Sequence, residues 1–417
     1  MINQPQETYH DASQWREFLL SLSSIFTLAV GTGAFLLLIV SFLESVHMPV
    51  NRIGLVISFF SGIQAVAVFL IGKYYRGTHF RVIVISAIVT QSLGVFLLAT
   101  LNTGLLLWIA MSLFGIGLGI ILVVLYSSAI QRRPKDVRPA VSIGIYTALV
   151  AGGNAVGAYL VGKVIDQYGY SAAFIFSGVF IIAAVFLVAF MGDKAVAPPM
   201  AEEPNNVDED LTEEKNTKLP LWKFGIAMAL IMSALMSVFD TLLPIYGMRA
   251  GMAMATIGAI AGFKMFMAAA SRPLTGFMLN KMAPNRVSNI SILGMIVFII
   301  LFPFSGMGTL AFIVAGLFGT SFGGVRVASL TSAIEGHTQS PAITRRVSHY
   351  RLSMTFGQIG GPYLAGLAAS VMIVSHAFIL MGVLFFVLFL ITLLVFQQIK
   401  PRQYFVKTRK LDTTELL

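Results

Sequence analysis

The sequence predicts an all-α membrane protein with 12 transmembrane helices in two pseudo-symmetric six-helix bundles. Three observations support this fold class. The 417 residues are 57% hydrophobic and only 11% charged, whereas an ordinary soluble domain carries about 25% charged residues. About twelve apolar runs, each close to the ~20 residues that cross a bilayer, follow one another along the chain. The two halves of the chain also repeat the same residue pattern.

The apolar runs are continuous and lack the polar/apolar alternation of transmembrane β-strands, so they predict helices. The first run is too long for the apolar segment of a signal peptide, and we interpret it as a retained span. In chain order the predicted spans lie near 18–43, 52–72, 81–101, 105–130, 139–162, 172–191, 222–246, 255–280, 287–305, 309–334, 346–371 and 376–398.

An internal repeat at a fixed offset of 204 residues relates the two halves. Residues 112–130 and 316–334 align without a gap, and eight of the nineteen positions are identical. A solenoid repeat has a period of roughly 20–50 residues, so this longer period predicts a duplicated bundle. Two such bundles would face each other across a substrate path. The same offset pairs Gly54/Gly258, Gly72/Gly276, Gly153/Gly357, Gly157/Gly361 and Gly162/Gly366.

The net charge of +10 is a topology signal and does not indicate a nucleic-acid partner. The loops on one side of the predicted membrane hold only Arg52, Lys163 and Arg249. By the positive-inside rule both termini are cytoplasmic, and we expect a protein of the bacterial inner (cytoplasmic) membrane. The chain has no cysteine, which excludes disulfides and thiolate metal sites. The cytoplasmic basic residues are Lys73, Arg76, Arg81, Arg132, Arg133, Lys135, Arg138, Lys281, Arg286, Arg345, Arg346, Lys400, Arg402, Lys407, Arg409 and Lys410.

These patterns divide the chain into four segments. We expect an N-terminal six-helix bundle at 1–192, a C-terminal six-helix bundle at 221–400 and a cytoplasmic tail at 401–417. Residues 193–220 are acidic and proline-containing, too polar to build a core, and therefore predict a cytoplasmic linker. Composition favours a solvated tether for this linker over the alternative, a regulatory or partner-binding segment.

Five ionisable residues lie within predicted spans, and all belong to the second half. A charge in the hydrocarbon region costs several kcal/mol, so these side chains should face the bundle interior or water. Spans three, six, nine and twelve have no ionisable residue in their interior and are predicted to face lipid. The first half repeats the pattern without these charges, so the scaffold does not need them. The five residues are therefore candidates for binding the substrate or an ion. Through the offset, Asp240, Lys264, Arg272, Arg326 and Arg351 fall on Leu36, Phe60, Val68, Leu122 and Thr147.

We expect the second half to present a cationic wall to an anionic or carboxylate-bearing substrate. Helical rise puts Asp240 and Lys264 in the outer third of the membrane, where they could pair, and the arginines nearer the cytoplasm. Structural ion pairs or snorkelling are the alternative, which applies most to Arg272 and Arg351. The first half adds neutral polar groups, each of which neighbours could also satisfy. They are Gln64, Gln91, Tyr126, Tyr146 and Asn154.

The segments after spans two and eight are GKYYRGTHFR (72–81) and GFMLNKMAPNR (276–286). Together with the twelve spans, the repeat and the long central loop, they resemble the major facilitator superfamily over essentially the whole chain. The family signature at this place is G-x-x-x-D-[RK]-x-G-[RK]-[RK]. Gly72 and Gly276 match it, whereas Arg76 and Asn280 stand where the family has an acid. The resemblance implies that these four positions belong to gating or packing elements.

Spans five and eleven resemble the antiporter signature of the family, G-x8-G-x3-G-P-x2-G-G. Such glycines permit close approach and bending of helices at a seam between the halves. Ordinary small-residue packing explains them equally well. Met111 stands where proton antiporters of the family commonly carry a span-four arginine. The matching positions are Gly144, Gly153, Gly157 and Gly162 in span five, with Ala158 replacing the proline, and Gly357, Gly361, Pro362 and Gly366 in span eleven.

The resemblance implies a secondary active transporter that works by alternating access, without enzymatic activity, cofactor or metal. We expect a proton-linked exporter, or antiporter, of a small organic solute that is drug-like or anionic. The alternative is an importer of an organic anion such as a carboxylate. The chain is expected to be a lipid-embedded monomer with no nucleic-acid partner. A membrane enzyme would need a nucleophile–base or metal constellation, and a sensor would need a further soluble domain; the sequence shows neither pattern.

Overall fold

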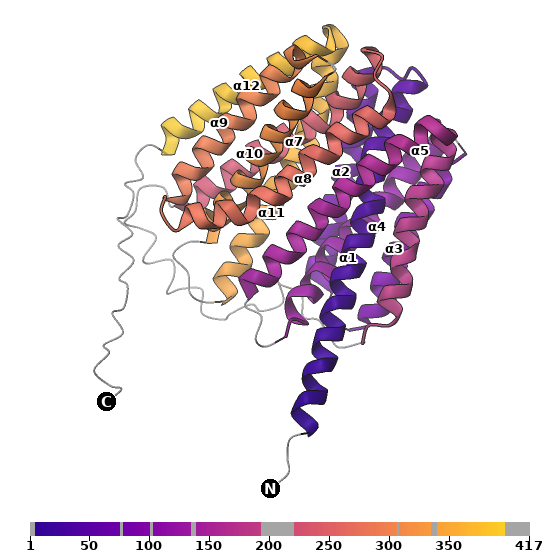
Figure 1. The fold of residues 1–417 in the computed structure, drawn as a ribbon, viewed down its shortest axis with the longest axis vertical. Coiled ribbons are helices and arrows are strands. Elements are labelled where there is room, and N and C mark those ends of the chain that lie inside the picture. The colour runs from indigo at the N-terminus through magenta and orange to yellow at the C-terminus, as the bar shows by residue number, and fades with distance from the viewer. Residues whose placement is uncertain are drawn as a thin grey trace.

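The computed structural model describes residues 5–75, 78–100, 103–134, 139–192, 221–306, 308–334 and 340–396. All regular secondary structure in these residues is helical, as the sequence predicts (Figure 1). The predicted linker at 193–220 and the tail at 401–417 lie outside the described residues. The boundaries of the four segments therefore stay predictions.

Five helices form the first half of the described chain. They are α1 (Pro5–Ser45), α2 (Val50–Tyr74), α3 (Phe80–Leu98), α4 (Leu105–Gln131) and α5 (Pro139–Ala189). Gly169 interrupts α5 with φ 79° and ψ 179°, a conformation that strains any residue with a side chain. Both arms of α5 pack on α1, since Gly33 touches Asn154 and Gly31 touches Ile181. The chain therefore reverses at Gly169, and the two arms are the predicted spans five and six.

The second half contains α7 (Leu221–Arg249), α8 (Met254–Leu279), α9 (Pro284–Leu301), the short 3₁₀ helix η2 (Phe302–Ser305), α10 (Thr309–Ile334), α11 (Ser340–Val371) and α12 (Val374–Phe396).

Within the described residues, ten helices are long and apolar enough to cross a membrane. That number treats α5 as one helix and leaves out α11, which is rich in glycine and polar residues. With both arms of α5 and with α11, the helices are consistent with the twelve predicted spans.

The first helix of each half ends in the same way. Residue His47 after α1 and residue Gly251 after α7 both have positive φ, 56° and 76°. The next N–H reaches back five residues, from Met48 to Leu43 and from Met252 to Gly247, at 3.0 and 2.9 Å. This pattern is the Schellman motif, which satisfies carbonyls left open at a helix C-terminus. His47 and Gly251 are 204 residues apart, so the repeat extends to helix termination.

The apolar core of each half is built around the same three phenylalanines. Phe35 stacks on Phe114 with ring centroids 3.8 Å apart, and Phe174 packs beside them. At the offset of 204, Phe239 stacks on Phe318 at 4.5 Å, and Phe378 packs beside that pair. The stacks join α1 to α4 and α7 to α10. Both halves therefore share core packing as well as helix order.

Two glycine contacts join the halves at the end opposite the termini, which we call the distal end. A Cβ on Gly54 of α2 would lie 2.4 Å from the Pro362 carbonyl oxygen and 3.0 Å from Gly366 of α11. A Cβ on Gly258 of α8 would lie 2.4 Å from the Ala158 oxygen and 3.2 Å from Gly162 of α5. The offset exchanges the two contacts. They are related by the pseudo-two-fold axis between the bundles.

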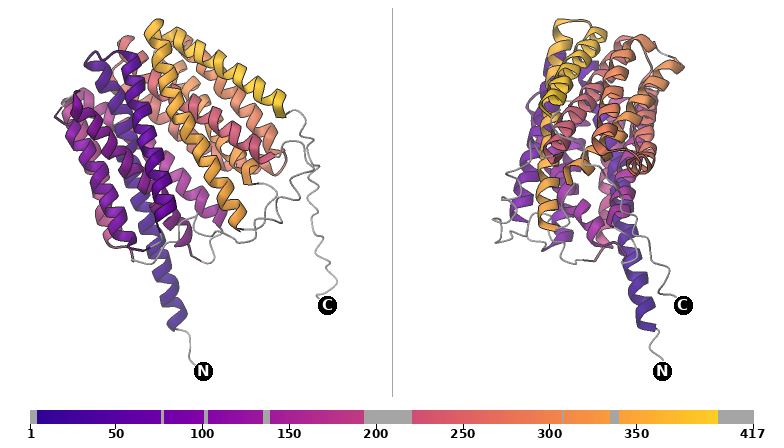
Figure 2. Two further views of the ribbon diagram at one scale, coloured as in Figure 1. Left: turned by 180° about the vertical axis from the view of Figure 1, so that it is seen from behind. Right: turned by 90° about the vertical axis from the view of Figure 1, so that its left-hand side faces the viewer.

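Polar contacts reinforce the distal end. Glu44 of α1 accepts a hydrogen bond from Arg249 of α7 at 2.7 Å. The carboxylate of Asp166 on α5 accepts from the backbone N–H groups of Met254 and Ala255, at 3.0 and 2.7 Å. It thereby caps the open N–H groups at the start of α8 in the other half. Figure 2 shows the helices of the two halves converging at this end and diverging toward the termini.

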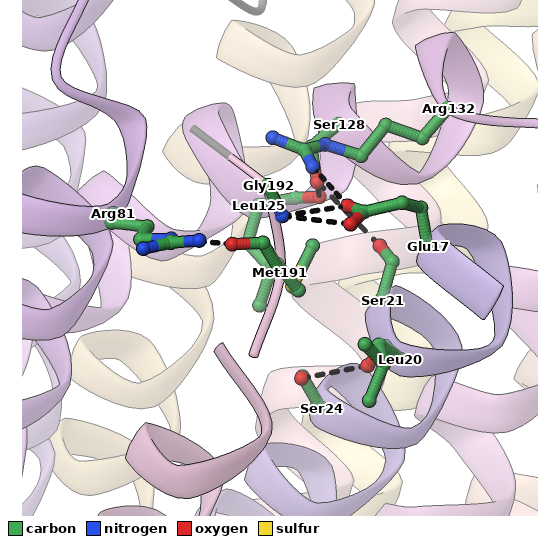
Figure 3. A network of polar contacts seen from close by, with 10 residues as sticks. All are labelled: Glu17, Leu20, Ser21, Ser24, Arg81, Leu125, Ser128, Arg132, Met191 and Gly192. Atoms are coloured by element: carbon green, nitrogen blue, oxygen red, sulfur yellow. Dashed lines mark hydrogen bonds and ion pairs between the residues drawn. The ribbon is translucent and has the colours of Figure 1, made fainter. Parts of the chain in front are cut away.

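A buried polar network lies at the other end of the first bundle (Figure 3). Glu17 of α1 pairs with Arg132, just after α4, at 2.5 Å, and both side chains are largely buried. Glu17 also accepts from the N–H of Gly192, at 2.8 and 2.9 Å. Arg81 donates to the carbonyl of Met191. This network holds the end of α5 against α1, α3 and α4.

We expect Glu17→Gln to lower the free energy of unfolding by about 3 kcal/mol, because it removes the carboxylate from a largely buried ion pair. Glu44→Gln is the matched control. Its partner Arg249 is half exposed, so that change should cost under about 1 kcal/mol. Thermal unfolding in detergent would compare the variants, and equal melting temperatures would contradict the expectation.

Gly258→Ala should prevent close contact of the halves at the distal end, because its Cβ meets a backbone oxygen that cannot move aside. The chain has no cysteine, so Ser237→Cys in the interior offers a single thiol for a membrane-impermeant maleimide added from the distal side. We expect several-fold faster labelling when Gly258→Ala is present. Gly152→Ala is the control, since a Cβ there meets nothing within 4 Å. Equal labelling rates in both backgrounds would show that the distal contact does not hold the halves together.

Candidate functional site

A cavity of about 290 Å³ lies between the two halves. Its lining comes mainly from α1, α2, α4, the first arm of α5, α7, α8, α10 and α11, with one residue from α3. No described residue of α9, α12 or the second arm of α5 lines it, which agrees with their predicted position facing lipid. The prediction for span three is wrong at one residue, because Gln91 of α3 reaches the cavity between neighbouring helices.

The lining positions largely repeat across the halves. Pairs at the offset of 204 include Leu36/Asp240, Phe60/Lys264, Leu122/Arg326, Asn154/Gln358 and Ala158/Pro362. The cavity therefore lies on the pseudo-two-fold axis. Its geometry is symmetric, whereas its polarity is not, because among the described residues the ionic side chains of the lining all come from the second half.

Asp240 of α7 and Lys264 of α8 form an ion pair inside the cavity wall. The lysine side chain is 1% exposed and the aspartate side chain is 46% exposed. The Lys264 ammonium also lies 4.9 Å from the ring centre of Phe239, a cation–π distance. Close packing on Gly319 fixes the backbone of Lys264, since a Cβ there would overlap its carbonyl oxygen. The carboxylate therefore faces the cavity and shields the ammonium behind it.

Two arginines line the cavity nearer the termini. Arg272 of α8 donates to the backbone carbonyl of Thr147 in the other half. Arg326 of α10 contributes a second guanidinium. Within the described residues, neither arginine forms an ion pair. The cavity therefore carries three cations and one carboxylate.

Arg351 lies outside the cavity lining. It donates to the carbonyl of Leu122 at 3.2 Å and to the hydroxyl of Tyr146 at 3.3 Å. Both acceptors belong to the first half, so Arg351 bridges the halves beside the cavity.

The neutral candidates of the first half lie mostly where the sequence suggests. Gln64, Gln91, Tyr146 and Asn154 line the cavity, whereas the side chain of Tyr126 is outside the described part of the chain. The sequence interpretation missed Thr32, Ser233, Ser237 and Gln358, all of which line the cavity. Gln358 could have been found, because the repeat pairs it with Asn154. The serines and threonine gave no signal, since such residues are common in membrane helices.

The predicted seam between the halves is wrong for four of its glycines. Gly153 and Gly157 pack α5 on α1, with Cβ positions 2.8 Å from the Phe26 oxygen and 2.0 Å from the Val30 oxygen. Gly357 and Gly361 pack α11 on α7 in the same manner. These contacts lie within each half, because the glycines face the first helix of their own bundle. Of the motif glycines in these two spans, Gly162 and Gly366 are the described ones that contact the other half.

The remaining described motif positions lie outside the cavity lining. Gly72 is buried, whereas Gly276 and Asn280 are exposed near the end of α8. A Cβ added at Gly144 or Gly276 would meet no other described part of the structure within 4 Å. Arg76 lies outside the described residues. In the described residues, no group of three or more His, Asp or Glu side chains could hold a metal ion.

A model of the Major Facilitator Superfamily matches residues 19–338 and 256–416. No curated protein matches the chain. Among solved structures, the nucleoside transporter NupG is similar, with 13% identity, a TM-score of 0.73, and coverage of 91% of this chain and 100% of that one. A structure described for proton dependent oligopeptide transporters shares 14% identity, with a TM-score of 0.70 and coverage of 92% and 98%. A POT family transporter in complex with a thioalcohol conjugated peptide shares 12%, with a TM-score of 0.71 and coverage of 92% and 96%. These likenesses concern the fold.

Folding should tolerate loss of both members of the ion pair, but it should not tolerate loss of Asp240 alone. Asp240→Asn leaves a buried ammonium without its counter-ion and should lower the melting temperature clearly. Adding Lys264→Met should restore most of the loss, because the first half packs Leu36 and Phe60 at the same positions. Lys264→Met alone should have a small effect, since Asp240 is half exposed. A double variant as unstable as Asp240→Asn would show that the scaffold needs the charges.

Proposed function

We propose, since this chain belongs to the major facilitator superfamily, that it is a secondary active transporter that exports a small organic anion in exchange for protons. The charge of the central cavity is the observation that supports an anionic substrate. The described lining contains three cationic side chains and one carboxylate, Asp240. The cations are Lys264, Arg272 and Arg326. Unpaired cations are costly in a membrane interior. An anionic solute between the arginines would supply the missing charge, whereas a cationic solute would add to the repulsion.

The size of the cavity supports a small solute. Binding pockets for drug-sized ligands occupy ≈300–1,000 Å³, and this cavity is about 290 Å³. Its lining combines apolar side chains with few polar groups, as is usual for small-molecule sites. We therefore place the substrate among compact organic acids.

The distal contacts support alternating access. The halves meet there through glycines and a few polar pairs, with no interlocked large side chains at Gly54/Gly366 or Gly162/Gly258. Small-residue contacts can separate without repacking a core, so the bundles can rock about the central site. With both termini in the cytoplasm, the diverging end faces the cytoplasm, and the cavity is loaded from that side.

Asp240 is the group that we assign to proton coupling. Its carboxylate is accessible from the cavity while its partner Lys264 is enclosed. Ionised Asp240 can accept a hydrogen bond from the solute while it balances the charge of Lys264. A proton arriving at Asp240 would remove that acceptor, so the proton and the solute would compete for the site. Mutually exclusive occupation is what exchange of a solute for protons requires.

Export is the direction favoured by the glycine pattern of span five. Import of an organic anion is the alternative, and vesicle orientation separates the two. Everted vesicles with an acidic interior should accumulate labelled malate, aspartate or citrate if the protein is a proton-linked exporter. Right-side-out vesicles with an acidic exterior should accumulate them if it is an importer.

Arg326→Leu should reduce this accumulation by about tenfold or more, because loss of a charge-assisted hydrogen bond to a bound anion costs at least ~1.5 kcal/mol. Arg326→Lys should keep part of the activity. Arg286→Leu is the control, since Arg286 is exposed at the start of α9. The proposal would be refuted if the Arg326→Leu variant transported as fast as the wild-type protein. It would also be refuted if no acid accumulated in either vesicle orientation.

A further inference from the structure

Opposite the ionic wall, the first half presents a hydrogen-bonded pair that the described contacts leave incomplete. Gln91 of α3 is fully buried, and its Nε2 donates to the Thr32 hydroxyl of α1 at 3.2 Å. Its Oε1 is buried and has no hydrogen-bond partner within the described residues. Both residues line the cavity. An unpaired amide oxygen is therefore available at the cavity wall.

The repeat shows that folding does not require this pair. At the offset of 204, Thr32 corresponds to Met236 and Gln91 to Met295, and both methionines are buried. The same helix crossing is thus filled by thioethers in one half and by a polar pair in the other. A buried acceptor without a partner destabilises a protein. Its presence at the cavity, where the scaffold accepts methionine, indicates a ligand role.

Two further acceptors line the cavity at a similar depth. Asn154 of α5 lines the cavity, and its Oδ1 is buried without a partner in the described part of the chain. Its backbone lies against Gly33, the residue after Thr32. Asp240 accepts from Lys264 through Oδ1, and its half-exposed side chain lines the cavity. Asp240 is the repeat counterpart of Leu36, one helical turn from Thr32, so the three acceptors share a similar depth.

The free cations lie at another level. Eight residues of α8 separate Lys264 from Arg272, which corresponds to ~12 Å along the helix. Arg272 also has a buried Nε without a partner among the described residues. The cavity is therefore divided along its length. Donors gather at the end near the termini, and acceptors gather at the distal end.

We propose that the transported solute is a small organic acid that also carries a hydroxyl or amino group. The carboxylate binds at Arg272 and Arg326, and the hydroxyl or amino hydrogens bind at Gln91, Asn154 and Asp240. This inference rests on the proposed function and narrows it. A polycarboxylate without a hydrogen-bond donor would leave the distal acceptors unpaired, so it should be a weaker substrate.

Matched acids test the inference in everted vesicles with an acidic interior. Citrate and tricarballylate differ by one hydroxyl, as do malate and succinate, and aspartate adds an amino group to succinate. We expect the donor-bearing acid of each pair to compete about tenfold better for uptake, the discrimination typical of one unpaired buried acceptor. Equal competition within every pair, with transport intact, would overturn this inference and leave the proposed function standing. No uptake or competition by any acid would contradict the proposed function itself.

Gln91→Met tests the assigned residue, because it introduces the side chain that the second half has at this position. It should reduce the preference for citrate and malate while retaining uptake of tricarballylate and succinate. Asn289→Ile is the matched control. Asn289 is another amide with a buried oxygen that has no partner among the residues described. It lies on α9 outside the cavity lining, and its repeat counterpart is Ile85. That change should leave the preference unaltered.

Asn154→Ala gives a second measurement if Gln91→Met lowers the melting temperature. It too should weaken the preference without abolishing uptake of the acids that lack a donor. An undiminished preference in both variants would exclude the first-half acceptors as the binding groups.

Discussion

Close contact between helix backbones at glycine residues holds the helices together within each half and joins the two halves. In a bilayer, lipid tails solvate apolar side chains as well as other helices do, so close van der Waals packing must hold helices together. Gly153 and Gly157 bring α5 against α1, and their counterparts bring α11 against α7. Gly162 and Gly366 then join one bundle to the other. The same device builds each half and closes the distal end, and it leaves the central cavity between the two sets of contacts.

The halves share their scaffold and differ in polarity. The stacks Phe35/Phe114 and Phe239/Phe318 show that the cores are copies. On these copies, the second half carries the ionic pair and the arginines, whereas the first half carries amides and hydroxyls. Each copy therefore serves as a control for the other. At the cavity, polar groups such as Gln91 and Asp240 stand where the other half has an apolar residue, so the shared scaffold does not call for them.

Much of the fold was predictable because its signals are local or repeated. Apolar runs of span length predict helices wherever they occur, and the intramembrane charges at Asp240 and Lys264 can be placed by helical rise alone. Other features depend on contacts between distant segments. The role of Gly157 depends on which helix it faces, and spacing does not contain that information. Gln91 is on a helix that is otherwise lipid-facing, so only its neighbours show that its amide reaches the cavity. The Glu17–Arg132 pair joins residues far apart in sequence, and no motif announces it.

By itself, the sequence determined the all-helical membrane class, the duplication and the restriction of the predicted intramembrane charges to one half. The reason is that hydropathy and the repeat offset depend only on the order of the residues. The tertiary structure alone decided which charges face the cavity and which bridge the halves, as Arg326 and Arg351 illustrate. It also decided which polar atoms remain without partners. The physical reason is that a helix presents side chains in every direction, and only packing against its neighbours determines which direction is protein, lipid or cavity.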